Sequence, residues 1–175
     1  IPAGRNRTFR MRTRRAVFLD RDGVVVRERG EHTWRVDDLE MLPTVAEAVK
    51  AVRAQGNLAV IITNQSGIAL GLYTHADVER AHAWIGACLA EEGTQLDAVY
   101  YCPHHPSQGR CLCRKPGSLM LERAMARYGI DPGASVMIGD RDRDVEAATA
   151  VGVRGVLVEA NSPLLDVLRT RTSLI

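Results

Sequence analysis

The sequence predicts a protein of the α/β class, with a mostly parallel central sheet covered by helices on both faces. Short apolar runs alternate with longer amphipathic stretches, which is typical of strands joined through helices. Residues 58–62, LAVII, are continuously apolar, as expected of a strand buried on both faces of a parallel sheet. Polar residues come directly after several of the apolar runs, at the strand ends where such sheets bind ligands.

The individual elements follow this alternation along the chain. Residues 16–19, AVFL, form a first strand that delivers Asp20 at its carboxyl end. A first helix ends at Gly56, and Thr74 with Asp77 three residues later resembles a capping box that begins another helix. Strands are predicted at residues 16–19, 58–62, 98–101, 135–138 and 155–158, and helices at 44–55, 74–92, 118–128 and from about 142.

The composition suits one globular domain. The chain has 175 residues, of which 46% are hydrophobic and 25% charged. No apolar run approaches the roughly 18 residues that span a bilayer. The Arg-rich N-terminus lacks the apolar stretch of a secretory signal. We therefore expect no membrane association and a cytoplasmic location. Because no feature indicates an obligate oligomer, we also expect a monomer.

Charge is distributed unevenly along the chain. Residues 1–15 contain six arginines and no acid, whereas the remainder contains 17 basic and 21 acidic residues. A basic leader of this kind is compatible with nucleic-acid binding, but its low apolar content favours a disordered extension. We expect residues 1–14 to form that extension and residues 15–175 to form a single domain, with nucleic acid not expected as a partner.

Acidic residues gather at two predicted strand ends. Asp20 and Asp22 flank Arg21 after the first strand, and strand alternation would place both carboxylates on one side with Arg21 pointing away. Asp140 and Asp144, in GDRDRD, follow another strand. Converging carboxylates repel one another and favour a hard cation such as Mg²⁺. Helix-capping aspartates are the alternative interpretation for each motif alone.

Two further segments favour phosphate binding. In TNQSG, Thr63, Asn64 and the backbone N–H groups that follow could surround a phosphate, although a plain turn has the same composition. Lys115 adds a positive charge that could balance an anionic nucleophile and a phosphoryl group.

The four segments together, DxD, then T, then K, then GDxxxD, resemble the haloacid-dehalogenase-like superfamily of phosphatases from about Ala16 to Val158. The resemblance implies a Rossmann-like three-layer sandwich. It also implies that Asp20 attacks phosphorus, while Asp22 protonates the leaving oxygen and later activates water. Thr63 and Lys115 would hold the phosphoryl oxygens. Asp20, Asp140 and the backbone carbonyl of Asp22 would bind catalytic Mg²⁺, with Asp144 in a supporting role.

A cluster of sulfur and imidazole ligands lies in the segment CPHHPSQGRCLC. Cys102, His104, Cys111 and Cys113 would saturate a tetrahedral Zn²⁺, which makes the site structural rather than catalytic. A redox or disulfide cluster is the alternative. His105 competes with His104 as the fourth ligand, and the family pattern favours His104. The zinc would stiffen the loop that leads to Arg114 and Lys115.

The motifs DRDG, TNQSGIA, YYCPHHP and CxCRKP resemble one branch of the superfamily, the D-glycero-D-manno-heptose-1,7-bisphosphate 7-phosphatases, with zinc-dependent histidinol-phosphate phosphatases as close relatives. This resemblance implies Mg²⁺-dependent removal of the 7-phosphate through a phospho-aspartate, in nucleotide-activated heptose biosynthesis. The implied substrate contacts are Glu28, Arg29, Gly30, Glu31, Thr63, Asn64, Gln65, Ser66, Arg114, Lys115 and Arg141.

Spacing and sequence departures bear on the substrate. The intervals 22–63 and 67–114 are too short for a separate lid domain, which predicts a capless enzyme. Residues 24–31 and the short zinc loop differ from the familiar pattern of the branch, and Arg141 stands where a lysine is common. The anomer and the sugar therefore stay open. Histidinol phosphate, another small phosphate ester and a DNA 3′-phosphate are alternative substrates, and a non-enzymatic zinc module is the alternative class.

Overall fold

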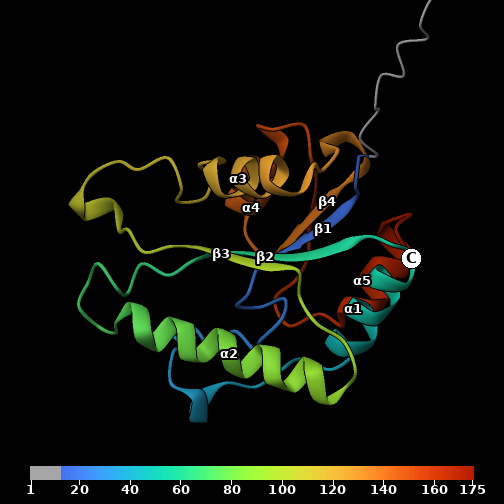
Figure 1. Cartoon of the computed structure of the whole chain (residues 1–175). Helices are drawn as coiled ribbons and strands as arrows, with labels where there is room; N and C mark the ends of the chain where they lie inside the picture. Colours follow the sequence, from blue (N-terminus) through green and yellow to red (C-terminus); the bar gives the residue numbers. More distant parts are fainter. Residues whose placement is uncertain (1–12) are drawn as a thin grey trace, which may run out of the picture.

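A parallel sheet of five strands forms the centre of the fold in the computed structural model, which describes residues 13–175 (Figure 1). The strands are β1 (Ala16–Leu19), β2 (Leu58–Asn64), β3 (Ala98–Cys102), β4 (Val136–Gly139) and β5 (Arg154–Leu157). Their order across the sheet is β3-β2-β1-β4-β5. The chain thus adds β2 and β3 on one side of β1, and later adds β4 and β5 on the other side. This reversal creates a topological switch point between β1 and β4, where such sheets bind ligands.

Helices cover both faces of the sheet and complete three layers (Figure 1). The helices are α1 (Val45–Ala54), α2 (His75–Glu91), α3 (Leu119–Tyr128), α4 (Asp142–Thr149) and α5 (Leu164–Arg171). Buried residues of α1, α2 and α5 join the hydrophobic cluster on one face of the sheet, and those of α3 and α4 join the cluster on the other face. The predicted Rossmann-like sandwich is confirmed.

The central strand is buried on both faces, as the apolar runs predicted. Val17 and Leu19 belong to one hydrophobic cluster, while Ala16 and Phe18 belong to the other. None of the four is more than 1% exposed. Because strand side chains alternate between faces, a strand covered by helices on both sides has no polar position.

Most element boundaries agree with the sequence prediction. The capping box of α2 is present, since Thr74 Oγ1 accepts from the Asp77 backbone N–H and the Thr74 N–H donates to Asp77 Oδ2 at 2.8 Å. Strand β2 continues through Thr63 and Asn64, beyond its predicted end. Helix α5 lies outside the predicted elements and buries Leu164, Val167 and Leu168 along one face, in contact with α1.

Neither of the two intervals that could hold a lid, 22–63 and 67–114, contains a separate domain in the described residues 13–175. Residues 20–44 form a loop with a short 3-10 helix, Val36–Asp38, and the segment 67–114 contains α2, β3 and the cysteine loop. The capless prediction is therefore confirmed for the part of the chain that the structure describes. No helix in that part is long and apolar enough to cross a membrane.

The basic extension expected at residues 1–14 falls almost entirely outside the described residues. Arg14, just before β1, hydrogen-bonds through its backbone: its N–H donates to the carbonyl of Gly129 at 2.9 Å and its carbonyl accepts from the N–H of Asp131 at 2.8 Å. These bonds align the entry of the chain into the central strand.

Candidate active site

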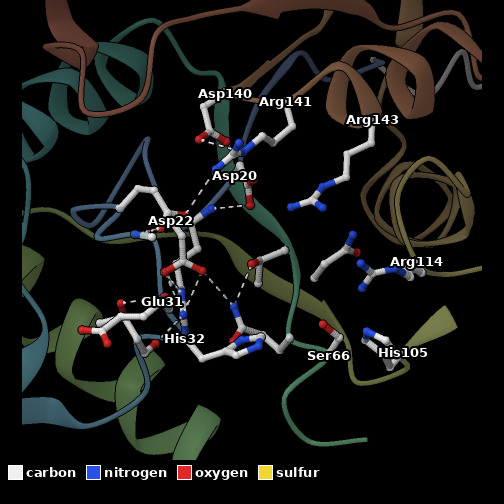
Figure 2. A pocket seen from close by; sticks show the side chains of 17 residues that line it. Asp20, Asp22, Glu31, His32, Ser66, His105, Arg114, Asp140, Arg141 and Arg143 are labelled. Atoms are coloured by element: carbon white, nitrogen blue, oxygen red, sulfur yellow. Dashed lines mark hydrogen bonds and ion pairs between the residues drawn. The ribbon is translucent and has the colours of Figure 1, made fainter. Parts of the chain in front are cut away.

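The carboxyl edge of the sheet carries a pocket of about 360 Å³ (Figure 2). Because β1 lies between β2 and β4, the residues that follow or end these strands meet at one place. The predicted site residues that line the pocket are Asp20, Asp22, Glu28, Gly30, Glu31, Thr63, Asn64, Gln65, Ser66, Arg114, Asp140 and Arg141. Four separate segments of the chain thus converge as predicted.

Two predicted site residues, Lys115 and Asp144, lie beneath the pocket rather than on its surface. The Lys115 side chain is 1% exposed, and its Nζ lies 2.9 Å from Asp20 Oδ1 and 2.6 Å from Asp144 Oδ1. The same ammonium donates to the carbonyl of Ile62 at 2.7 Å. A buried ammonium requires this degree of compensation. Lys115 therefore places a positive charge directly against the Asp20 carboxylate.

Three carboxylates lie close enough to share a cation. Asp20, Asp140 and Asp144 each offer an oxygen within 4.8 Å of the others. Burial, followed by the negative charge of Asp20, raises the pKa of Asp140 to about 6. Asp140 Oδ2 is buried and accepts no hydrogen bond from the described residues, although Arg141 Nε lies 3.4 Å away. A crowded set of hard oxygen donors with an unsatisfied buried oxygen fits Mg²⁺.

Asp144 is the most constrained of the three carboxylates. Its Oδ1 pairs with Lys115, and its Oδ2 accepts from the Arg141 backbone N–H at 3.0 Å. One oxygen therefore forms an ion pair and the other accepts a hydrogen bond, which suits a supporting position. The Asp22 side chain is not part of the acidic cluster, as expected if only its backbone carbonyl binds the metal.

Two glycines allow these carboxylates to approach. Gly23 has a φ of +84°, and a Cβ there would lie 2.6 Å from Asp140 Oδ2. At Gly139 a Cβ would lie 2.2 Å from the Cβ of Asp144. Both separations are far below van der Waals contact, so a side chain at either position would displace an acidic residue of the site. The glycines of DRDG and GDRDRD thus have a steric basis.

The interaction between Arg21 and Asp22 corrects one prediction. Strand alternation predicted that Arg21 points away from Asp22, but its Nε and Nη2 donate to Asp22 Oδ1 at 3.1 and 2.8 Å. Nη2 also donates to the carbonyl of Thr33 at 2.7 Å. The prediction was wrong because the extended conformation ends at Leu19: the backbone N–H groups of Val25 and Val26 bond to the Arg21 carbonyl and form a turn.

The environment of Asp22 favours a carboxyl group that can exchange a proton. Burial raises its pKa above the ordinary aspartate value, and the charge of Asp20 acts in the same direction. The charge and hydrogen bonds of Arg21 oppose these effects without reversing them. A raised pKa keeps the proton on Asp22 to higher pH than on an exposed aspartate, which suits a general acid.

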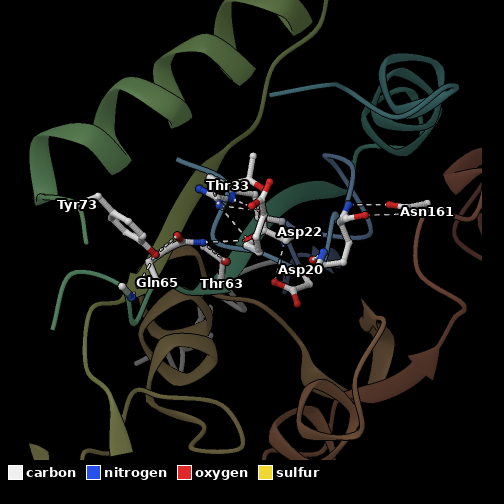
Figure 3. A network of polar contacts seen from close by, with 12 residues as sticks. Asp20, Asp22, Thr33, Thr63, Gln65, Tyr73 and Asn161 are labelled. Atoms are coloured by element: carbon white, nitrogen blue, oxygen red, sulfur yellow. Dashed lines mark hydrogen bonds and ion pairs between the residues drawn. The ribbon is translucent and has the colours of Figure 1, made fainter. Parts of the chain in front are cut away.

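Gln65 connects the predicted acid–base residue with the predicted phosphate ligand (Figure 3). Its Nε2 donates to Asp22 Oδ2 at 3.2 Å and to Thr63 Oγ1 at 3.0 Å. Its Oε1 accepts from the Tyr73 hydroxyl at 3.0 Å, and that hydroxyl accepts from the Gly67 N–H at 3.2 Å. Gln65 is 2% exposed. These bonds use the whole amide, so Gln65 is placed to orient Asp22 and Thr63.

Substituting Gln65 by leucine should lower kcat about tenfold, since two active-site groups lose a shared donor. The lost hydrogen bond lowers the pKa of Asp22 in the parent protein, so that pKa should rise in the variant. We expect the pH profile of kcat to move to higher pH, measured against Gln55→Leu, an exposed control on the end of α1. An unchanged kcat and profile would exclude this positioning role.

The cysteine loop brings its four predicted ligands together. Cys102 ends β3, and Cys102, His104, Cys111 and Cys113 offer atoms within 4.8 Å of one another. His104 Nδ1 lies 3.3 Å from Cys113 Sγ, and Cys102 Sγ lies 3.7 Å from Cys111 Sγ. The cysteines are free thiols, so no disulfide competes in the described chain. Three sulfurs and one imidazole at this spacing fit a tetrahedral Zn²⁺.

The neighbouring histidine has a different position. His105 Nδ1 accepts from the Ser107 backbone N–H at 3.2 Å, and the residue lines the active-site pocket. It is not part of the ligand cluster. The geometry therefore favours His104 over His105 as the imidazole ligand.

The cluster is connected directly to Arg114 but less directly to Lys115. The Arg114 N–H donates to Cys111 Sγ at 3.4 Å, and its Nη1 donates to the His104 carbonyl at 3.3 Å. Lys115 is held instead by Asn64, whose Oδ1 accepts from the Lys115 N–H at 3.0 Å and whose Nδ2 donates to its carbonyl at 3.2 Å. Asn64 therefore uses its side chain on the protein backbone, although it also lines the pocket.

Arg29 is the predicted site residue that the structure does not bring to the pocket. Its Nη2 lies 3.4 Å from Glu40 Oε2, and both side chains are exposed. Its neighbours Glu28, Gly30 and Glu31 do line the pocket. The geometry thus gives no support to a substrate contact by Arg29.

Several pocket residues were not predicted. These are Arg21, His32, Thr33, His105 and Arg143. Arg143 had a usable signal, because it lies two residues after Arg141 in the same strand-end motif. Arg21 and Thr33 had none, because their contact depends on how the loop after β1 folds back.

Comparisons with known proteins agree with the fold. Residues 112–168 match a family model described as HAD-hydrolase-like. The chain is 40% identical over 157 residues to the D-glycero-beta-D-manno-heptose-1,7-bisphosphate 7-phosphatase of Escherichia coli strain K12, covering 85% of this chain and 81% of that protein. It is 39% identical to the enzyme of the same name from Haemophilus ducreyi, covering 81% and 80%.

Solved structures give the same result. The D,D-heptose 1,7-bisphosphate phosphatase from B. bronchiseptica, complexed with magnesium and phosphate, superposes with a TM-score of 0.79 at 33% identity, covering 89% of this chain and 86% of that one. The corresponding phosphatase from Burkholderia thailandensis superposes with a TM-score of 0.63 at 27% identity, covering 91% and 87%. The chain therefore belongs to the HAD-like hydrolase family, in the branch of the heptose-1,7-bisphosphate 7-phosphatases.

Proposed function

We propose that the protein removes the 7-phosphate from D-glycero-β-D-manno-heptose 1,7-bisphosphate through a phospho-aspartate intermediate. The observation that carries this proposal is the buried Asp20 carboxylate at the base of the pocket, 2.9 Å from the Lys115 ammonium. The names of the relatives support the sugar and the β anomer. The predicted place in nucleotide-activated heptose biosynthesis and the cytoplasmic location follow from that assignment.

The first half of the reaction uses Asp20 as nucleophile and Asp22 as acid. The Asp20 carboxylate attacks phosphorus, and the bond from phosphorus to the C7 oxygen breaks. Asp22 gives its proton to that oxygen, because an alkoxide is a poor leaving group. Thr63 and Lys115 hold the phosphoryl oxygens, and the charge of Lys115 offsets the repulsion between the phosphate and Asp20.

The second half regenerates the enzyme. Asp22, now a carboxylate, accepts a proton from a water molecule whose oxygen attacks phosphorus. The bond between phosphorus and Asp20 breaks, and inorganic phosphate leaves. Arg21 and Gln65 keep Asp22 oriented through both steps, since they contact both of its oxygens.

The acidic cluster supplies the place for a cation. Asp20, Asp140 and the backbone carbonyl of Asp22 would hold Mg²⁺, which when bound neutralises charge on the transferring phosphoryl group. Asp144 supports the cluster through Lys115 and the Arg141 backbone. The Cys102, His104, Cys111 and Cys113 set would hold Zn²⁺ with no position left for water, so its role is structural.

The walls of the pocket suit the rest of a sugar bisphosphate. Glu28, Gly30 and Glu31 come from the loop after β1, and Ser66 from the loop after β2. Glu31 and Ser66 offer groups that can bond to sugar hydroxyls. Arg114 offers a guanidinium for a second phosphate, which it can bind in bidentate fashion.

The proposal is tested by phosphate release with Mg²⁺ on both anomers of the heptose bisphosphate, histidinol phosphate and a 3′-phosphorylated oligonucleotide. We expect the β anomer to have the highest kcat/KM, by at least about tenfold, with the Asp20→Asn variant as the background control. Faster turnover of histidinol phosphate or of the oligonucleotide would retain the mechanism and overturn the substrate. Gel filtration of the same preparation tests the predicted monomer.

A further inference from the structure

Four arginines line the pocket: Arg21 is paired with Asp22, and two of the other three have no acidic partner among the described residues. Arg114, Arg141 and Arg143 all line it, and Figure 2 shows Arg114 and Arg143 on the side opposite Glu31. Arg141 has acidic neighbours: its Nε lies 3.4 Å from Asp140 Oδ2 and its Nη2 3.9 Å from Glu28 Oε2. Neither Arg114 nor Arg143 has a carboxylate within ion-pair distance in residues 13–175.

Arg143 lines the pocket and has an unused donor. It is half-buried in the first turn of α4, directly before the buried Asp144. Its Nε is inaccessible to solvent and has no hydrogen-bond partner among the described residues. A buried N–H without an acceptor is costly, and the cost is larger for a charged group. Because Arg143 lines the pocket and has no carboxylate within ion-pair distance in residues 13–175, its positive charge favours an anionic ligand there.

The two unpaired guanidinium groups also influence each other. Both groups line the same pocket. Like charges that face one pocket repel each other unless an anion lies between them. A phosphate can accept from both guanidinium groups at once, since its oxygens match the planar fork of arginine.

We propose that Arg143 and Arg114 together hold the phosphate that is not transferred, which makes Arg143 a specificity-determining residue for bisphosphate substrates. This inference rests on the proposed function. Lys115 and a cation at the acidic cluster offset the charge of the transferred phosphate, so further positive charge is needed only for a second phosphate. Arg141 instead lies near Asp140 and Glu28, which offset its charge.

The test compares substrates with and without the second phosphate. Arg143→Ala should lower kcat/KM for the heptose 1,7-bisphosphate about 10- to 100-fold, and change that for the heptose 7-phosphate less than about threefold. The kcat/KM of Arg143→Lys for the bisphosphate should lie between those of Arg143→Ala and the parent, because lysine keeps the charge but not the planar fork of donors. Arg123→Ala, on the exposed face of α3, is the matched control and should leave both values unchanged.

Equal losses on the two substrates would overturn the inference while the proposed function stands. If the parent protein hydrolyses neither heptose ester, the proposed function fails. The inference is then tested independently, by measuring how tightly the protein binds ligands with one and with two phosphates. The probes are then 1,6-hexanediol bisphosphate and hexyl phosphate, measured by calorimetry on the Asp20→Asn protein. Tighter binding of the bisphosphate than of hexyl phosphate supports the Arg114–Arg143 site if Arg143→Ala reduces this preference strongly and Arg143→Lys reduces it less. Equal affinity for both probes overturns it.

Discussion

Replacing Asp20 by asparagine should lower kcat by about four orders of magnitude or more, because the amide cannot act as the attacking nucleophile. The change keeps the shape of the side chain and removes one negative charge from the pair with Lys115. Lys115 retains Asp144 and the Ile62 carbonyl as partners, so the fold should persist. The effect is therefore expected in kcat rather than in the yield of folded protein.

Phosphate release under excess bisphosphate measures this loss, and circular dichroism measures folding. Asp37→Asn, an exposed change in the 3-10 helix Val36–Asp38, is the control and should keep full activity. Acid-quenched parent enzyme should contain a phosphorylated peptide that includes Asp20, detected by mass spectrometry. Retention of more than about one-hundredth of the parent kcat, or label on another residue, would refute the covalent route.

Removing zinc should lower both stability and substrate affinity. The four ligands join the end of β3 to a loop of 3-10 and irregular structure, and burial of the loop is slight around Leu112, which is 76% exposed. The free energy of unfolding should therefore fall by roughly 3 kcal/mol or more. For the bisphosphate, KM should rise about 10- to 100-fold, whereas kcat should change less.

The unequal effect on KM and kcat follows from the hydrogen bonds of the loop. Arg114 is held by Cys111 and by the His104 carbonyl, so loss of the metal releases its guanidinium. Lys115 is held by Asn64 and by its own buried contacts, which do not involve the cysteines. Binding of the second phosphate should therefore suffer before the attack by Asp20 does.

A zinc-selective chelator with Mg²⁺ kept in excess makes the measurement, with metal content determined by mass spectrometry and recovery tested by one equivalent of Zn²⁺. Cys88→Ser provides the control, because Cys88 lies in α2 outside the cluster and its loss should leave zinc content and kinetics unchanged. Protein that lacks zinc but keeps its stability and KM would disprove the structural role.

The sequence predicted the sheet, and it predicted that the polar strand ends meet at one edge of it. Continuous apolar strands such as residues 58–62 and capping signals such as Thr74 with Asp77 are local features, visible in a single sequence. Their regular alternation also determines that polar strand ends meet at one edge. Helix α5 lay outside the predicted elements, since its eight residues contain only one short apolar stripe.

The contacts within the site were less predictable. Arg21 was expected to point away from Asp22, yet its guanidinium binds that carboxylate because the chain turns after Leu19. Asn64 was expected at the phosphate and Gln65 at the substrate, but their amides bond to Asp22, Thr63 and the backbone of Lys115. Such bonds depend on side-chain angles and loop paths, which no local sequence pattern specifies.

By itself, then, the sequence determined which ionisable and metal-ligating groups are present: the carboxylate at the end of the central strand, the lysine after the cysteine loop, and the three thiols with one imidazole. Only the tertiary structure decided how each is paired. It placed Lys115 between Asp20 and Asp144, and left Arg114 and Arg143 facing the pocket without an acidic partner among residues 13–175. The reason is physical: residue types carry the chemistry, whereas charge pairing depends on distances between segments that are remote in the chain.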